Sequence, residues 1–435
     1  MAKHTMQELY QWQALPLNIK VRMTAERIRS WVNEFGEDGV YLSFSGGKDS
    51  TVLGHIIREV CGYKNIPFVF VDVPTQYPEL KQFAQTFDNL VILKPKISFA
   101  QVCEKYGFPM ISKEVSECVY YAKKYLKSIV DKIESESTIL TDRQTDRQTD
   151  RQTDRQTDRQ TDRQTIIGSA QMADILCVER RLNKENYKKV MTEIIPSELE
   201  KAYRIAKSSG EKIDCRTKIL FGELEHKEKG IATDEYSKTY DKSRYKFFLD
   251  APFDLCGNEC CKTMKKEPLR LYGRKSKRVP ITAQMASESK LRTQSWLQSG
   301  CNAFDSKNPM SNPMSFWTEQ DVLLYIKEKN LPICSVYGEV VIDYEAMGQC
   351  ENQMSFADFG IFDKERPLLK TTGCQRTGCV LCGFGCHLEK ESRFLRLKET
   401  HPKFHNLLYI LKNNGVTYAE AIDWVNEHGN MNIKY

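Results

Sequence analysis

The chain has no long apolar segment. No apolar run in its 435 residues approaches the ~18 residues that a membrane-spanning helix needs. The first residues, Met1 to Glu8, are too polar for a secretory signal peptide. We therefore expect a cytoplasmic protein without a membrane partner.

An excess of charge of one sign is also missing. The 64 basic and 58 acidic residues give a formal net charge of +6. This balance accommodates a phosphate-bearing substrate or a nucleic acid without requiring either. No repeat of aromatic and basic residues indicates a defined nucleic-acid surface, so a nucleic-acid partner is possible but unsupported. The oligomeric state does not follow from the sequence.

A turn with two adjacent glycines follows the apolar run 40–44 and precedes a helix pattern that begins at Thr51. The glycines let backbone N–H groups crowd together, and the helix directs its positive end at the same point. Such a turn binds phosphate. The expected nucleotide-binding residues of the turn are Ser45, Gly46, Gly47, Lys48, Asp49 and Ser50.

Two further apolar runs, at residues 66–71 and 90–93, read as buried parallel strands, and an amphipathic helix pattern spans about 20–40. Strands and helices thus alternate. The pattern predicts an α/β fold with a doubly wound, mostly parallel sheet that binds ligands at the carboxyl ends of its strands. Asp72 directly follows the second strand and joins the nucleotide-binding candidates.

Composition divides the chain into three parts. Residues 1–115 form the nucleotide-binding α/β region, 116–245 a charged helical insertion, and 246–435 the remainder with a Cys-rich region and C-terminal helices. Helices are expected after an N-cap at Thr318, around 407–411 and over 419–425. The insertion contains Thr-Asp-Arg-Gln six times in tandem at 141–164. This repeat has no apolar residue to bury, so we assign it no chemistry.

The chain has 15 cysteines, and two groups of them are dense. In a reducing compartment such groups indicate metal or redox chemistry rather than disulfides. One assembly joins Cys260 and Cys261 to Cys379 and Cys382. The other uses the second group alone, which consists of Cys374, Cys379, Cys382 and Cys386, and Cys256 of the first group is a further alternative ligand. Four thiolates complete either a [4Fe-4S] cluster or a zinc site, and the adjacent pair favours the cluster.

Other chemically capable residues have structural interpretations. His387 is expected to pack beside the cysteines rather than bind metal. His401 and His405 have metal-capable spacing but no third ligand, so we interpret them as structural. Cys301 is interpreted as a turn cysteine.

The glycine turn resembles the SGGxDS PP-loop of the adenine-nucleotide alpha-hydrolase superfamily, which has a Rossmann-like (HUP) fold. Segments at 260–269, 281–292 and 316–337 are similar to motifs of the phosphoadenosine phosphosulfate (PAPS) reductase family within that superfamily. The resemblance implies an adenine-nucleotide substrate, and it implies that the adjacent cysteine pair and the later CxxC hold a [4Fe-4S] cluster. By the same resemblance, Lys265, Lys266 and Arg292 would neutralise a substrate phosphate or sulfate.

The chain also departs from this family. No cysteine follows Cys386, so the C-terminal ECG[IL]H motif of the catalytic reductases is absent. Ala283 and Met285 replace a glycine and an arginine of the motif at 281–292. These departures argue against the usual thiol route of sulfate-level reduction and indicate a divergent member, whose catalytic residue the sequence does not identify.

Three functions fit these observations. The first is an adenine-nucleotide-dependent sulfur-transfer or redox enzyme that binds ATP or a PAPS-like nucleotide and has a thiol or electron-donor protein as partner. In it, Asp72 would orient the ribose, the base or Mg²⁺. The second is an ATP pyrophosphatase that adenylates a nucleic-acid base or backbone for sulfur insertion. The third is a non-catalytic nucleotide-binding protein.

Overall fold

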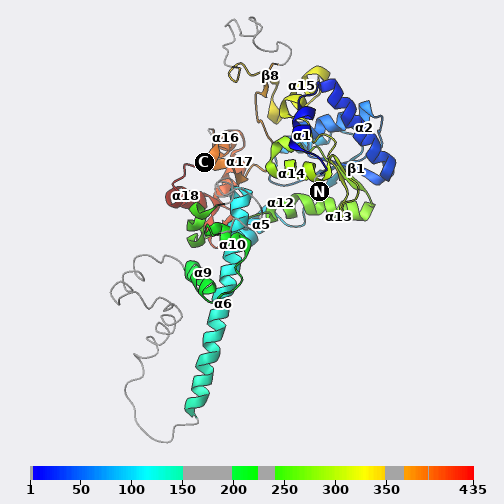
Figure 1. The fold of residues 1–435 in the computed structure, drawn as a ribbon. Coiled ribbons are helices and arrows are strands. Elements are labelled where there is room, and N and C mark those ends of the chain that lie inside the picture. The colour runs from blue at the N-terminus through cyan, green and yellow to red at the C-terminus, as the bar shows by residue number, and fades with distance from the viewer. Residues whose placement is uncertain (1–2, 150–197, 224–240, 348–366, 390) are drawn as a thin grey trace. The chain divides into compact units, whose positions relative to one another are not determined.

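The computed structural model describes residues 3–149, 198–223, 241–347, 367–389 and 391–435 (Figure 1). The chain divides into two compact units, each assembled from segments far apart in the sequence. Unit 1 comprises Met1–Phe99 and Cys261–Cys382, and unit 2 comprises Ala100–Cys260 and Gly383–Tyr435. The three-part division inferred from composition stays a prediction.

Unit 1 contains a six-stranded sheet in the order β3-β2-β1-β5-β7-β6. Neighbouring strands are parallel except β6 and β7, which are antiparallel. The expected α/β class and the three predicted strands are therefore confirmed. The strands are β1 (Val40–Phe44), β2 (Phe68–Val71), β3 (Leu90–Leu93), β5 (Val279–Ile281), β6 (Asn302–Ala303) and β7 (Met310–Ser311).

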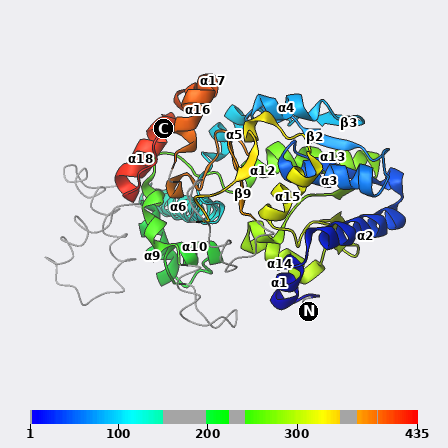
Figure 2. The same cartoon turned by 90° about the horizontal axis from the view of Figure 1, so that it is seen from above.

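Helices cover both faces of this sheet (Figure 2). Val40, Leu42 and Phe44 of β1 point to one face, where they join a buried core with α2 and α3. Tyr41 points to the other face and packs edge-to-face on Tyr272 of α13. The helices of unit 1 are α1 (Met6–Gln13), α2 (Leu17–Phe35), α3 (Lys48–His55), α4 (Pro78–Ala84), α13 (Glu267–Ser276), α14 (Lys290–Ser299) and α15 (Glu319–Lys329).

Three parts of unit 1 lie near the carboxyl end of β1: the glycine turn with α3, the start of α15, and the segment of the second cysteine group. Helix α3 begins directly after the glycine turn, and α15 packs against α3. Thr318 caps α15 in a reciprocal arrangement with Asp321, as the sequence predicts. A two-stranded ribbon, β8 (Val340–Ile342) and β9 (Leu369–Thr371), leads into the second cysteine group.

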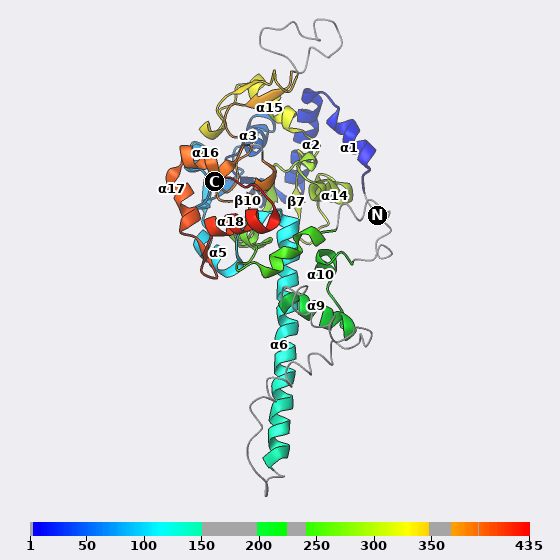
Figure 3. The same ribbon diagram turned by 90° about the vertical axis from the view of Figure 1, so that its left-hand side faces the viewer.

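Unit 2 is mainly helical. Its longest element, α6 (Lys113–Thr149), has α9 (Glu198–Ser208) and α10 (Cys215–Leu220) packed beside it (Figure 3). The other elements are α5 (Phe99–Tyr106), α12 (Glu259–Cys261, which ends in unit 1), α16 (Arg393–Thr400), α17 (Pro402–His405), α18 (Tyr418–Gly429) and the strands β4 (Met110–Ile111), β10 (Gly383–Phe384), β11 (Lys412–Asn413) and β12 (Val416–Thr417).

The predictions for unit 2 have mixed outcomes. Helix α18 confirms the helix expected over 419–425. The segment around 407–411 is instead a short 3₁₀ turn at Asn406–Tyr409, followed directly by β11, because the chain reverses into a hairpin there. The first nine residues of the tandem repeat lie in α6, and the rest lie outside the described residues. Within the described ranges, no helix has the length and apolar character that crossing a bilayer requires.

Candidate functional site: a glycine turn and a group of thiols

The glycine turn joins β1 to α3 in a conformation that requires glycine. Gly46 has a φ of 72°, and a Cβ on it would lie 2.9 Å from the carbonyl oxygen of Leu80. An L-residue would therefore suffer backbone strain and a collision with main chain at this position. Gly47 follows in an extended conformation as the N-cap of α3, so the first N–H groups of the helix open toward the turn.

The serines hold the turn from within. The Ser50 hydroxyl donates to the carbonyl oxygen of Gly47 at 2.9 Å and lies 3.0 Å from the hydroxyl of Ser45. The backbone N–H of Ser45 in turn donates to the Ser50 hydroxyl at 3.3 Å. Ser50 is buried, so we interpret its hydroxyl as a group that stabilises the conformation of the turn.

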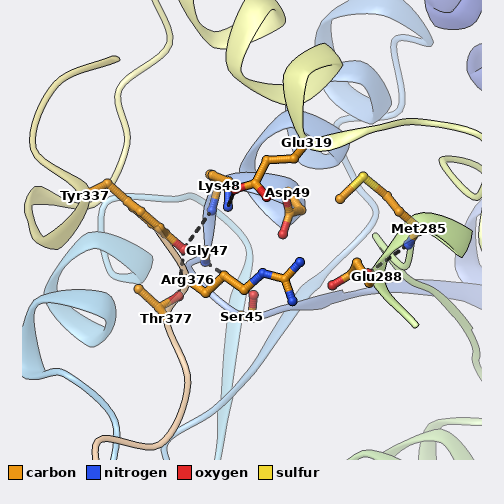
Figure 4. Close-up of a pocket in the computed structure, with 10 residues that line it drawn as sticks. All are labelled: Ser45, Gly47, Lys48, Asp49, Met285, Glu288, Glu319, Tyr337, Arg376 and Thr377. Carbon is orange, nitrogen blue, oxygen red and sulfur yellow. Dashed lines mark hydrogen bonds and ion pairs between the residues drawn. The ribbon is translucent and has the colours of Figure 1, made fainter. Parts of the chain in front are cut away.

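A pocket of about 110 Å³ opens at this turn (Figure 4). Such a volume is below the ~300–1,000 Å³ of sites that enclose a whole small molecule, so it matches one end of a ligand. Four of the six predicted turn residues contribute to the lining. The lining residues are Ser45, Gly47, Lys48, Asp49, Met285, Glu288, Glu319, Tyr337, Arg376 and Thr377.

The ammonium group of Lys48 is buried in the wall of this pocket. The side chain of Lys48 is 4% exposed; its Nζ donates to the carbonyl oxygen of Gln375 at 2.8 Å and lies 3.2 Å from the carboxylate of Glu319. The same Nζ lies 5.5 Å from the centre of the Tyr337 ring. The charge that the sequence offers for a phosphate therefore already has a carboxylate partner.

Charged side chains of both signs lie near Asp49, the residue after Lys48. Burial raises the pKa of the Asp49 carboxyl group, since it disfavours the charged form. The positive charge of Lys48 opposes this rise, Glu319 adds to it, and Arg376 and Arg292 oppose it. The Oδ1 atom of Asp49 is buried without a hydrogen-bond partner among the described residues.

The segment between the first two cysteines of the second group contributes to this pocket, which our sequence interpretation missed. Gln375 supplies the carbonyl that holds Lys48, Arg376 lines the pocket, and the Thr377 hydroxyl lies 2.6 Å from that of Tyr337. The Tyr337 hydroxyl also accepts the backbone N–H of Lys48 at 3.3 Å. In the sequence this segment is interpreted only through its cysteines, although an arginine in a glycine-containing loop could have indicated an anion-binding segment.

The other predicted nucleotide-site residues lie at varied places. Asp72 follows β2 and forms an ion pair with Lys81 at 2.7 Å, and it is not among the lining residues of the pocket. Arg292 is close enough to Asp49 for their charges to interact, and it pairs with Glu288, which lines the pocket. Burial lowers the pKa of Arg292. Lys266 is exposed on the turn that precedes α13.

Lys265 lies instead among thiols of unit 1. Burial acts to lower the pKa of Lys265, but the charges of Cys379, Cys261 and Cys382 and a hydrogen bond with Cys379 raise it above its ordinary value. The structure therefore brings three of the four predicted ligand cysteines to one ammonium group. A nearby cation stabilises the thiolate form, which is the form that binds metal.

The remaining cysteines of the two groups have other surroundings. The thiol of Cys374 is buried and lies 3.7 Å from the Tyr77 hydroxyl. In unit 2, Cys256 accepts the backbone N–H of Cys260 at 3.3 Å, and Cys386 is buried. Among the residues that the structure describes, no three or more His, Cys, Asp or Glu side chains form a group that could hold a metal ion.

The residues that we interpreted as structural have surroundings of that kind. Cys301 is buried, and this burial raises the pKa of its thiol. His401 lies between α16 and α17, and His405 is buried against Tyr409. Burial lowers the pKa of His387 below its ordinary value.

Comparison with known proteins identifies the family. The model of the phosphoadenosine phosphosulfate reductase domain matches residues 39–172 and 181–383, which is more than half of the chain. The chain therefore belongs to the phosphoadenosine phosphosulfate reductase family, as its motifs predict, and the match supports a nucleotide-dependent, sulfur-related enzyme.

Among solved structures, one match is phosphoadenylyl-sulfate (PAPS) reductase from Candida auris in a phosphate complex. The two chains are 11% identical with a TM-score of 0.29, over 77% of this chain and 91% of that one. No curated protein matches the chain.

Proposed function

We propose that this chain is an adenine-nucleotide-dependent enzyme of sulfur transfer or redox chemistry, and that the glycine turn holds the phosphate end of its nucleotide. The observation that carries the proposal is the pocket itself. It combines the opening turn of α3 with the charges of Lys48 and Arg376, within a chain of the phosphoadenosine phosphosulfate reductase family. The ligand would be ATP or a PAPS-like nucleotide.

Each residue of the pocket has a role in this proposal. The backbone N–H groups at the start of α3 and the ammonium of Lys48 would bind phosphate oxygens. Arg376, and Arg292 once it is released from Glu288, would neutralise a second phosphate or a sulfate. Lys265 lies with the thiols, so we propose that it stabilises their ionised forms. For Lys266 and Asp72, contact with the nucleotide stays a prediction.

The thiols of Cys261, Cys379 and Cys382 are proposed as ligands of a [4Fe-4S] cluster, with zinc as the alternative. The donor type fits, because three thiols interact with one ammonium group that favours their thiolate forms, although as placed among the described residues they do not form a metal-binding group. Cys260 belongs to the other compact unit and stays a predicted fourth ligand. Such a cluster would supply electron or sulfur transfer when bound.

One observation favours ATP pyrophosphatase chemistry as a second candidate. Three carboxylates line the pocket (Asp49, Glu288 and Glu319) against two cations, Lys48 and Arg376. A nucleotide whose phosphates carry Mg²⁺ has a smaller negative charge to place beside those carboxylates. In this reaction an acceptor oxygen attacks the α-phosphorus of ATP, the bond to the bridging oxygen breaks, and pyrophosphate leaves.

Calorimetric titration of the full chain with ATP and with PAPS tests the binding site. Lys48→Met should weaken the binding of whichever nucleotide binds by about 10-fold to 100-fold, because a hydrogen bond from a charged group contributes ~1.5–3 kcal/mol. The matched control is Lys329→Met, on the exposed end of α15. Equal affinity for nucleotide in the wild type and Lys48→Met would refute the pocket assignment.

The products distinguish the two reactions. Sulfite released from PAPS in the presence of dithiothreitol as reductant supports the first, and pyrophosphate released from ATP supports the second. A protein that binds nucleotide but forms neither product would be the non-catalytic binder that the sequence also allows.

A further inference from the structure

The ion pair of Lys48 and Glu319 occupies a position that a ligand would need. Lys48 can direct three N–H bonds, and the carbonyl of Gln375 and the carboxylate of Glu319 already engage its ammonium group. The ring of Tyr337 covers a further side at 5.5 Å. A phosphate oxygen that binds this ammonium group must therefore compete with the Glu319 carboxylate.

Glu319 is free to give way. It is the first residue of α15, but the capping of this helix uses Thr318 and Asp321, so the Glu319 carboxylate has no part in the cap. Its side chain is 38% exposed and lines the pocket. Displacement of this carboxylate into solvent would leave the start of the helix intact.

The other charges of the pocket show what kind of ligand could displace it. Figure 4 shows Asp49 and Arg376 directed into the space between Glu319 and Glu288, with Lys48 beside Glu319. A single phosphate at Lys48 exchanges one anion for another and still lies near Glu319 and Asp49. A ligand with two adjacent phosphoryl groups has a further charged group for Arg376, the second cation that lines the pocket.

We propose that Glu319 is an inhibitory residue of this site: its carboxylate competes for Lys48 and thereby lowers the affinity for any phosphate-bearing ligand, so that only a ligand with further contacts, such as two linked phosphoryl groups, binds tightly. The proposal rests on the proposed function only in taking the glycine turn as a phosphate site. It concerns the anionic end of the ligand and not the adenosine part or the reaction.

The test uses inorganic phosphate and inorganic pyrophosphate as probes, titrated calorimetrically into the full chain. Glu319→Gln keeps the size and hydrogen-bonding capacity of the side chain and removes its charge. We expect it to raise the affinity for phosphate about tenfold and the affinity for pyrophosphate at least as much, because both probes displace the same carboxylate. The matched control is Glu328→Gln, exposed on the same helix, which should match the wild type.

Three results would overturn the proposal. They are a Glu319→Gln protein with unchanged or weaker affinity for both probes and a wild-type urea unfolding midpoint, an equal gain in the Glu328→Gln control, and no binding of either probe to any variant. If the expected shift occurs but ATP and PAPS do not bind, the proposed function fails and the role of Glu319 stands. If a nucleotide binds but the shift is missing, only the role of Glu319 fails.

Discussion

The first turn of α15 contains two lysine–carboxylate pairs that differ in how firmly they are enclosed. Asp321 pairs with Lys20 at 2.6 Å, and the two side chains are 9% and 1% exposed. Glu319 pairs with Lys48 at 3.2 Å, and its side chain is 38% exposed. Two residues of one helix turn thus bind two buried ammonium groups in different ways.

The surroundings explain the difference. The carboxylate of Asp321 also accepts the backbone N–H and the hydroxyl of Thr318, at 2.8 and 2.7 Å, and Lys20 donates to the carbonyl of Gln13 at 2.6 Å. This pair is therefore buried within a hydrogen-bond network. The pair of Glu319 and Lys48 faces a pocket. The comparison separates a charge pair that maintains the fold from one that a ligand can replace.

The largest expected effect is that of breaking the enclosed pair. Lys20→Met should lower the free energy of unfolding by about 3–5 kcal/mol, because it leaves the carboxylate of Asp321 buried without its counter-charge. Urea unfolding followed by circular dichroism measures this change. Lys329→Met, at an exposed site, serves as the control, and a loss below about 1 kcal/mol would show that the pair is not structural.

A second prediction concerns Lys265, a lysine whose partners are thiols instead of a carboxylate. Lys265→Met should weaken metal binding about 10-fold to 100-fold, as loss of a group that supports metal ligands does. Iron, sulfide and zinc analysis after anaerobic purification measures this. The adjacent exposed Lys266→Met should retain the wild-type metal content, and equal losses in both variants would argue against a specific role of Lys265.

A smaller effect on stability is expected for the pair that faces the pocket. Lys48→Met should change the free energy of unfolding by only about 0–1 kcal/mol, because Glu319 is exposed enough for water to replace its partner. The same urea experiment measures it. A loss as large as that of Lys20→Met would remove the distinction between the two pairs.

The smallest effect is a pH dependence at Asp49. Its pKa is raised in the folded protein by burial, so the ionised carboxylate costs stability, and this cost grows as pH rises from about 3.9 through the folded pKa. Asp49→Asn should therefore be more stable than the wild type at neutral pH, with a difference that shrinks toward about pH 4. Thermal unfolding across this pH range measures it, and a difference that does not depend on pH would contradict it.

Local patterns in the sequence predicted the parallel sheet and the glycine turn. Apolar runs of four to six residues that alternate with helix patterns favour buried strands, and adjacent glycines between strand and helix allow few conformations. The cap at Thr318 follows from the same kind of local rule. For these features the deciding interactions are close in sequence.

The rest of the site depends on contacts between distant segments. Tyr337 and Gln375 bind Lys48 although they lie 289 and 327 residues after it in the sequence. No local pattern in either segment predicts these contacts. The sequence predicts Lys265 at a phosphate, but a positive charge by itself does not identify its partner. In the structure Lys265 interacts with thiols. The prediction of a helix around 407–411 was wrong for a similar reason. The 3₁₀ turn ends at Tyr409, and the chain then enters the hairpin of β11 and β12.

The segment 374–379 has a practical consequence for work with this protein. Within six residues it provides a carbonyl, an arginine and a threonine for the pocket and then Cys379, whose thiol hydrogen-bonds to Lys265. Under the proposed function, oxygen or chelators that alter the thiol end would also disturb the nucleotide end of the same segment. Nucleotide affinities of aerobically and anaerobically handled samples should then differ.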